Sequence, residues 1–99
     1  MIVHSVFMKL KHPKDSKEEA SFIAEAAKLA DIPEVLDYEI VREVSPKNNF
    51  EFGLTMKFAS TEAYQAYNEH PSHVDFVEDT WIPNVEVFQE IDYVNLSER

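Results

Sequence analysis

Two parts of the sequence carry side chains that could transfer protons. His4 lies in an alternating N-terminal segment, and the run from Tyr67 to His73 reads Tyr-Asn-Glu-His-Pro-Ser-His. If Tyr67 and His73 approach the space that His4 faces, one histidine can remove a proton next to a carbonyl group. Tyr67 or the second histidine would then donate a hydrogen bond to the developing enolate. This chemistry needs no cofactor.

Metal and nucleotide sites have little support in the same residues. His4, His70 and His73 offer three nitrogen ligands in principle, but Pro71 separates the last two and no compact motif such as His-Glu-x-x-His occurs. No histidine is singled out as an axial ligand for haem. The absence of cysteine excludes a thiol nucleophile, and a single glycine leaves no glycine-rich phosphate loop. We therefore expect neither a metal nor a cofactor.

The charge balance narrows the range of partners. The 99 residues include 9 Lys and Arg against 19 Asp and Glu, for a formal charge of -10. Such a chain repels nucleic acid and anionic lipid. The N-terminal segment lacks the basic region and apolar run of a signal peptide, and no stretch approaches the length of a membrane span. We expect a cytoplasmic protein that binds neither nucleic acid nor membranes.

The elements that must position these side chains can be predicted from periodicity. A single domain is expected over residues 1–95, followed by a frayed tail at 96–99. Alternating apolar residues predict strands at 2–10, 35–44, 50–58 and 85–93. In the first strand, His4 shares a face with Val6 and Met8, which we expect to meet the helices. A polar ring on that face needs a partner.

Capping residues predict the helices. Ser16 and Glu19 form a capping box that begins a helix ending near Ala30, and Ser60 begins a second helix that runs into His70-Pro71. Pro71 then opens a further helical turn through Val74 and Val77. The expected core stripe of the first helix consists of Ala20, Ile23, Ala27 and Ala30, broadened by Phe22, Ala26 and Leu29. We interpret the acidic pair Glu18-Glu19 as a solvated face, and His12 as a surface-loop residue.

The order strand, helix, strand, strand, helix, strand predicts an α+β fold. Its form is the ferredoxin-like βαββαβ arrangement, a four-stranded antiparallel sheet with helices on one face. Val3, Phe7 and Val41 would leave an apolar patch on the helix-free face of a monomer. A second copy of the sheet packed there would cover the patch, so we predict a homodimer through this face.

Several sequence features resemble a known family. They are the strand-start His4, the segment Phe58-Ala-Ser-Thr-Glu-Ala-Tyr64, the Tyr-x-x-His-Pro-x-His spacing of 67–73, and Ile91-Asp92-Tyr93. Essentially the whole chain is similar to the stress-responsive A/B barrel (Dabb) family, which implies a dimeric α/β barrel. The family's plant polyketide cyclase closes a linear polyketide by intramolecular aldol condensation. Similarity to it implies catalytic roles for His4, Tyr67 and His73.

Three functions stay open at this point. The leading hypothesis is a pocket between sheet and helices that binds a small, mostly apolar carbonyl or polyketide-like compound and catalyses cyclisation or isomerisation. The alternatives are a non-enzymatic, stress-responsive dimeric domain and a cofactor-free monooxygenase. A cavity shared by His4, Tyr67 and His73 would favour the first, and a filled core would favour the second. Phe76 and Trp81 are expected to pack rather than line a pocket.

Overall fold

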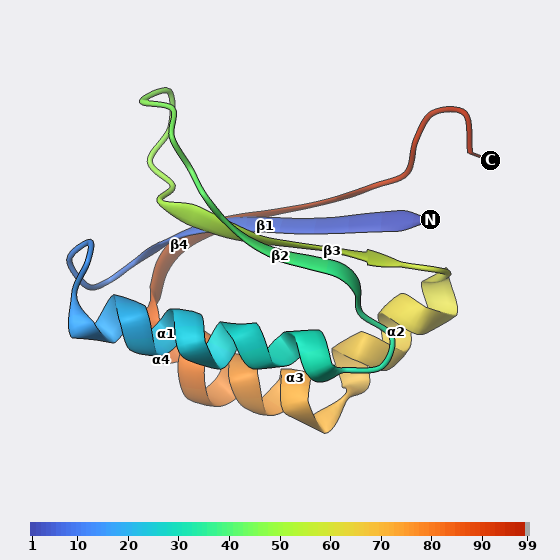
Figure 1. Cartoon of the computed structure of the whole chain (residues 1–99), viewed down its shortest axis with the longest axis horizontal. Coiled ribbons are helices and arrows are strands. Elements are labelled where there is room, and N and C mark those ends of the chain that lie inside the picture. Colours follow the sequence, from blue (N-terminus) through green and yellow to red (C-terminus); the bar gives the residue numbers. More distant parts are fainter. Residues whose placement is uncertain (99) are drawn as a thin grey trace.

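The computed structural model describes residues 1–98, which form one antiparallel sheet with helices on a single face (Figure 1). The strands are β1 (Ile2–Leu10), β2 (Leu36–Arg42), β3 (Phe52–Phe58) and β4 (Val85–Tyr93). They lie in the order β2-β3-β1-β4, with β2 and β3 as a hairpin. The predicted ferredoxin-like α+β fold is confirmed. Arg99, the end of the predicted tail, lies outside the described residues.

The helices begin at the predicted capping residues. The helical segments are α1 (Lys17–Ala27), η1 (Lys28–Asp31), α2 (Thr61–Glu69), α3 (Pro71–Phe76), the π-helical η2 (Val77–Trp81) and α4 (Ile82–Asn84). Ser16 Oγ accepts a hydrogen bond from the Glu19 amide, and Ser60 Oγ accepts one from the Ala63 amide. Within residues 1–98, the helices are all too short or too polar to cross a bilayer.

The central strands bury one side of their alternating pattern against the helices. In β1 the buried side comprises His4, Val6, Met8 and Leu10, and in β3 it comprises Phe52, Leu54, Met56 and Phe58. The register places His4 opposite Met56 on β3 and opposite Asp92 on β4. The predicted orientation of His4 towards the helices is therefore confirmed, and the register provides the polar partner that its ring requires.

The predicted core stripe of α1 is wrong at three alanines, whereas the residues expected only to broaden it are the ones that are buried. Its buried positions, continued into η1, are Glu19, Phe22, Ala26 and Leu29, while Ala20, Ala27 and Ala30 are exposed. Phe22 and Leu29 remove more apolar area from water than alanines do, so this face turns inward. Glu19 is carried inward with them and accepts a hydrogen bond from Arg42 Nη2 at 3.3 Å. The interpretation of Glu19 as part of a solvated face is also wrong.

His12 is not a free surface residue either. It is half-buried, and its Nε2 lies 2.7 Å from Oδ1 of Asn84. The neighbouring Lys11 amide donates to the Asn84 carbonyl oxygen at 2.8 Å. The segment after β1 is thus joined to the end of α4, just before β4, a contact between distant segments that the local Pro-Lys sequence does not reveal.

The opposite face of the sheet carries no helix of the described chain (Figure 1). The pairing of β1 with β4 places Val3 beside Tyr93 and Ser5 beside Ile91 on this face. The ring of Phe7 covers Gly53, where a Cβ would come within 2.6 Å of it. Figure 1 also shows the β2–β3 connection and the C-terminal segment projecting on this side of the sheet.

Candidate active site

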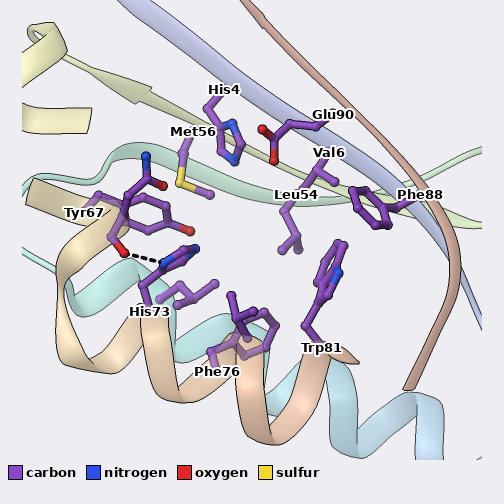
Figure 2. A pocket seen from close by; sticks show the side chains of 13 residues that line it. His4, Val6, Leu54, Met56, Tyr67, His73, Phe76, Trp81, Phe88 and Glu90 are labelled. Carbon is purple, nitrogen blue, oxygen red and sulfur yellow. Dashed lines mark hydrogen bonds between the residues drawn. The ribbon is translucent and has the colours of Figure 1, made fainter. Parts of the chain in front are cut away.

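A cavity of about 230 Å³ lies between the helix-covered face of the sheet and the helices (Figure 2). The residues that line it are His4, Val6, Leu29, Leu54, Met56, Tyr67, Asn68, His73, Phe76, Val77, Trp81, Phe88 and Glu90. In Figure 2, His4, Tyr67 and His73 gather at one end, and Phe76, Trp81 and Phe88 gather at the other. The cavity therefore has a polar end and an aromatic end. Phe76 and Trp81 line it as well as pack, contrary to the expectation of packing alone.

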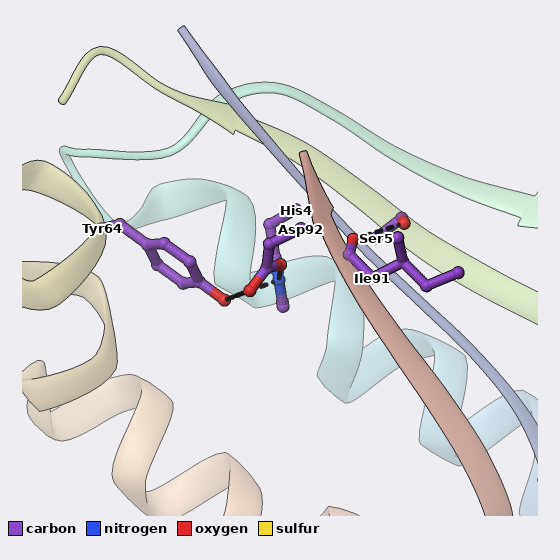
Figure 3. A network of polar contacts seen from close by, with 5 residues as sticks. All are labelled: His4, Ser5, Tyr64, Ile91 and Asp92. Atoms are coloured by element: carbon purple, nitrogen blue, oxygen red, sulfur yellow. Dashed lines mark hydrogen bonds and ion pairs between the residues drawn. The ribbon is translucent and has the colours of Figure 1, made fainter. Parts of the chain in front are cut away.

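His4 is anchored on its Nδ1 side by two residues from distant elements (Figure 3). Its Nδ1 lies 2.6 Å from Asp92 Oδ1, and the hydroxyl of Tyr64 on α2 lies 2.8 Å from both that Nδ1 and Asp92 Oδ2. Phe58 stacks on the Tyr64 ring at a centroid distance of 4.8 Å, which fixes the hydroxyl in place. Nδ1 of His4, a residue that is only 6% exposed, thereby has its polar partners.

These contacts determine which nitrogen of His4 carries a proton. An ionised carboxylate only accepts hydrogen bonds, so Nδ1 must donate to Asp92 at this separation. Burial, with the adjacent Asp92 carboxylate, raises the pKa of Tyr64 far above its ordinary value, so the hydroxyl stays protonated and donates to Asp92 Oδ2. Neutral His4 then has its lone pair on Nε2, and its ring points into the cavity in Figure 2.

His73 is anchored in the same manner by a backbone group. The break before Pro71 ends α2 and frees the carbonyl of Asn68, and His73 Nδ1 donates to that oxygen at 3.0 Å (Figure 2). Burial lowers the pKa of His73, which favours the neutral ring at neutral pH. Neutral His73 thus also presents an unprotonated Nε2, on the edge of the ring away from Asn68.

Tyr67 lies between the two histidines. Its ring centroid is 4.4 Å from that of His73 and 6.2 Å from that of His4, and the residue is 2% exposed. Burial raises the pKa of Tyr67 well above its ordinary value, so the side chain stays a hydroxyl donor. Within residues 1–98 this hydroxyl has no hydrogen-bond partner, which leaves it free for a ligand.

The three residues that the sequence predicts as a site therefore line one cavity, while other histidines do not. His70 accepts a hydrogen bond from the Ser72 amide at 3.1 Å and caps α3, and it does not line the cavity that His4 and His73 share. The sequence reasoning missed Tyr64, Glu90 and Asp92. One potential ligand atom from each of His4, Glu90 and Asp92 lies within 4.8 Å of the others, and within this group His4 and Asp92 are in direct contact.

Comparison with known proteins identifies the family. Residues 2–95 match the model of the stress-responsive A/B barrel domain, Dabb. The chain belongs to the Dabb family. A ferredoxin-like Dabb protein from Mesorhizobium loti is 48% identical, with 97% of each chain covered and a TM-score of 0.95. The resemblance seen in the sequence is confirmed. No curated protein matches this Dabb chain.

More distant structures share the Dabb fold. A hydroxynitrile lyase from Passiflora edulis is 20% identical over 99% of this chain and 96% of that one, with a TM-score of 0.84. A dimeric ferredoxin-like protein from Thermobifida fusca is 19% identical over 95% of this chain and 90% of that one, with a TM-score of 0.79. At these identities the likeness shows the fold and does not transfer an activity.

Proposed function

We propose that this Dabb protein is a cofactor-free acid–base catalyst that binds a small, mostly apolar carbonyl compound in the cavity. The observation that carries the proposal is the matched anchoring of His4 and His73. Each ring donates from Nδ1 to a fixed acceptor, so in its neutral form each ring offers an unprotonated Nε2 to the cavity, beside the free Tyr67 hydroxyl. Enolisation requires a positioned base that removes the proton and a positioned hydrogen-bond donor that stabilises the enolate oxygen.

In the proposed reaction, Nε2 of His4 takes the proton from the carbon next to the carbonyl group. The electrons of that C–H bond move into the substrate as an enolate, and the Tyr67 hydroxyl donates a hydrogen bond to its oxygen. Asp92 stabilises the positive charge that His4 gains, and Tyr64 holds Asp92 in place. His73 Nε2 accepts a hydrogen bond from a substrate hydroxyl and orients the compound. Return of the proton from His4 to the same carbon gives exchange, and its delivery to another carbon gives isomerisation. Attack of the enolate carbon on a second carbonyl group, whose oxygen then takes the proton from His4, gives cyclisation.

The alternatives have less support at this site. A non-enzymatic domain would be supported by a filled core, whereas the cavity has a volume of about 230 Å³. A likeness to a putative antibiotic biosynthesis monooxygenase from Nitrosomonas europaea, 19% identical, concerns the fold alone. No contact in the cavity specifically favours the monooxygenase chemistry. A cytoplasmic location remains a prediction.

We also infer that the protein forms a homodimer through the helix-free face. The face carries Val87, Ile91 and Tyr93 at 40%, 51% and 53% exposure. Apolar side chains exposed on one sheet face favour a self-complementary partner. Two fold neighbours, from Thermobifida fusca and Bacteroides fragilis, are described as dimeric, which supports the same assembly here.

The proposed catalysis is tested by exchange of the protons next to a ketone. 4-Phenylbutan-2-one is incubated in D2O with the wild type, His4→Ala, Tyr67→Phe or the control His12→Ala, and the loss of its α-proton signals is followed by NMR. We expect the wild type and His12→Ala to accelerate exchange, and His4→Ala to lose about a hundredfold or more of that acceleration. Equal exchange by His4→Ala and the wild type, with both folded, would rule the proposal out.

A further inference from the structure

Glu90 gives the cavity a negative charge that the proposed proton transfer does not use. It precedes Asp92 by two residues and therefore lies on the same face of β4, opposite Val6 of β1. Glu90 is exposed and yet lines the cavity, which places it at the opening to solvent. Figure 2 shows its carboxylate beside the ring of His4.

No positive side chain balances this carboxylate. The lining contains neither Lys nor Arg, and among residues 1–98 no ion pair or hydrogen bond involves the Glu90 side chain. The charge is free to act on a ligand. It acts from the edge of a largely apolar cavity, where it is screened less than a fully solvated charge.

The polar end of the cavity also offers more acceptors than donors. The neutral rings of His4 and His73 accept at Nε2 and the Glu90 carboxylate also accepts, whereas the Tyr67 hydroxyl donates. The side-chain amide of Asn68, which also lines the cavity, adds one donor group and one acceptor, so acceptors still outnumber donors. A bound carboxylate would bring two more acceptors and a like charge to this end. The carboxylate oxygens would displace water molecules from the polar end without replacing the hydrogen bonds that these waters donate to it. This loss disfavours binding.

We propose that Glu90 makes the cavity selective for compounds with an apolar body and an ammonium or hydroxyl group at the polar end, and excludes carboxylates. The inference rests on the proposed function in that it uses the same cavity, but it concerns the class of ligand rather than the reaction. An engineered cavity of about 150 Å³ holds benzene. The 230 Å³ here suit an aromatic ring with a short chain, with the ring against Trp81 and Phe88.

Three probes with the same phenyl-alkyl body and a head group of different charge test this inference. They are 3-phenylpropan-1-amine, 3-phenylpropan-1-ol and 3-phenylpropanoate, and their dissociation constants are measured by titration calorimetry at pH 7 on the wild type and on Glu90→Gln. Glu78→Gln is the matched control, since it removes the same charge from an exposed residue outside the cavity. Circular dichroism and elution volume check that all three proteins fold and assemble alike.

In the wild type and in Glu78→Gln we expect the amine to bind tightest and the carboxylate at least about tenfold more weakly. In Glu90→Gln the ratio should fall about threefold or more, because the carboxylate binds better and the amine binds worse, while the remaining acceptors still favour the amine. Equal binding of amine and carboxylate by the wild type, an unchanged ratio in Glu90→Gln, or no binding of any probe would each overturn the inference.

The outcome separates this inference from the proposed function. A wild type that shows the charge preference but does not exchange the protons of 4-phenylbutan-2-one would retain the ligand class and lose the reaction. A wild type that exchanges these protons but binds amine and carboxylate alike would retain the reaction and lose the role of Glu90.

Discussion

The two faces of the sheet differ in how far their apolar side chains are covered. On the helix-covered face, Val6, Met8 and Leu10 are at most 5% exposed, while on the other face Ile91 and Tyr93 are 51% and 53% exposed. Strand alternation makes both faces largely apolar, but the chain has helices for only one of them. The covered face encloses a core with a cavity in it, and the free face is available to a second chain. We therefore place the chemistry on one face and the assembly on the other.

The largest expected effect comes from the covered face. Phe22 is 2% exposed and packs against the rings of Phe52 and Phe76 at centroid distances of 5.8 and 5.7 Å. Phe22→Ala should lower the free energy of unfolding by about 3–5 kcal/mol, because it leaves a cavity in a packed aromatic cluster. The measurement is urea unfolding at a fixed protein concentration. Val87→Ala on the free face should cost less than about 1.5 kcal/mol, and equal losses would erase the contrast between the faces.

A charge on the free face should break the assembly. Ile91→Asp places a carboxylate among apolar side chains, so the dissociation constant of the dimer should rise about a hundredfold or more. Light scattering after size exclusion, over a dilution series, measures the change. The control Ala20→Asp adds the same charge to an exposed position of α1 and should stay dimeric. A dimer unaffected by Ile91→Asp would mean that assembly uses another surface.

A smaller effect is expected where a carboxylate is buried under the covered face. Glu19 is 4% exposed, and Arg42 is its partner at 3.3 Å. Arg42→Ala should lower the free energy of unfolding by about 1–3 kcal/mol, because the carboxylate loses its cation and stays buried. Adding Glu19→Gln should recover part of this loss. Lys28→Ala, which breaks an exposed pair with Glu25, should cost about 0.5 kcal/mol or less. Similar losses in both variants would contradict the account.

The smallest effect concerns the dependence of stability on pH. Burial lowers the pKa of His73 in the folded protein below its ordinary value of about 6.5, so the unfolded chain binds a proton that the folded chain resists. The stability that comes from keeping His73 neutral in the folded protein is fully present above about pH 6.5 and is lost as the pH falls below it. His73→Gln should therefore lose less stability between pH 7.5 and 5.5 than the wild type does, as measured by urea midpoints. A larger loss of stability in His73→Gln than in the wild type over this pH range would contradict the account.

The fold could be predicted because the strands and helices are marked by patterns of residues close together in the sequence. Period-two alternation marks β1 and β3, and the capping residues Ser16 and Ser60 mark where helices begin. The core stripe of α1 could not be predicted in the same way, because the alanine stripe competes with that of Phe22 and Leu29. Packing against the sheet decides between two neighbouring apolar stripes, and the burial of Glu19 depends on Arg42 from β2.

The site was predicted in part for the same reason. The Tyr-x-x-His-Pro-x-His spacing is local, so Tyr67 and His73 could be named, and His4 followed from its position on a buried strand face. Asp92 was missed because its contact with His4 depends on the register between β1 and β4, which are joined by the rest of the chain. The alternation of β4 could have indicated that Asp92 belongs to the site. Asp92 lies on the opposite side from Ile91 and Tyr93, and a charged residue there faces the helices.

The central claim is that His4 and His73 both donate from Nδ1 and turn Nε2 towards one cavity. Long-range ¹H–¹⁵N NMR correlations of the imidazole rings test it most directly, at pH 7.5, where His73 is neutral. The account predicts the Nδ1-protonated tautomer for both His4 and His73, and His4 should lose this preference in Asp92→Ala. If either ring carries its proton on Nε2 in the wild type, it presents a donor to the cavity and cannot act as the base or acceptor described, and the proposed site would be contradicted.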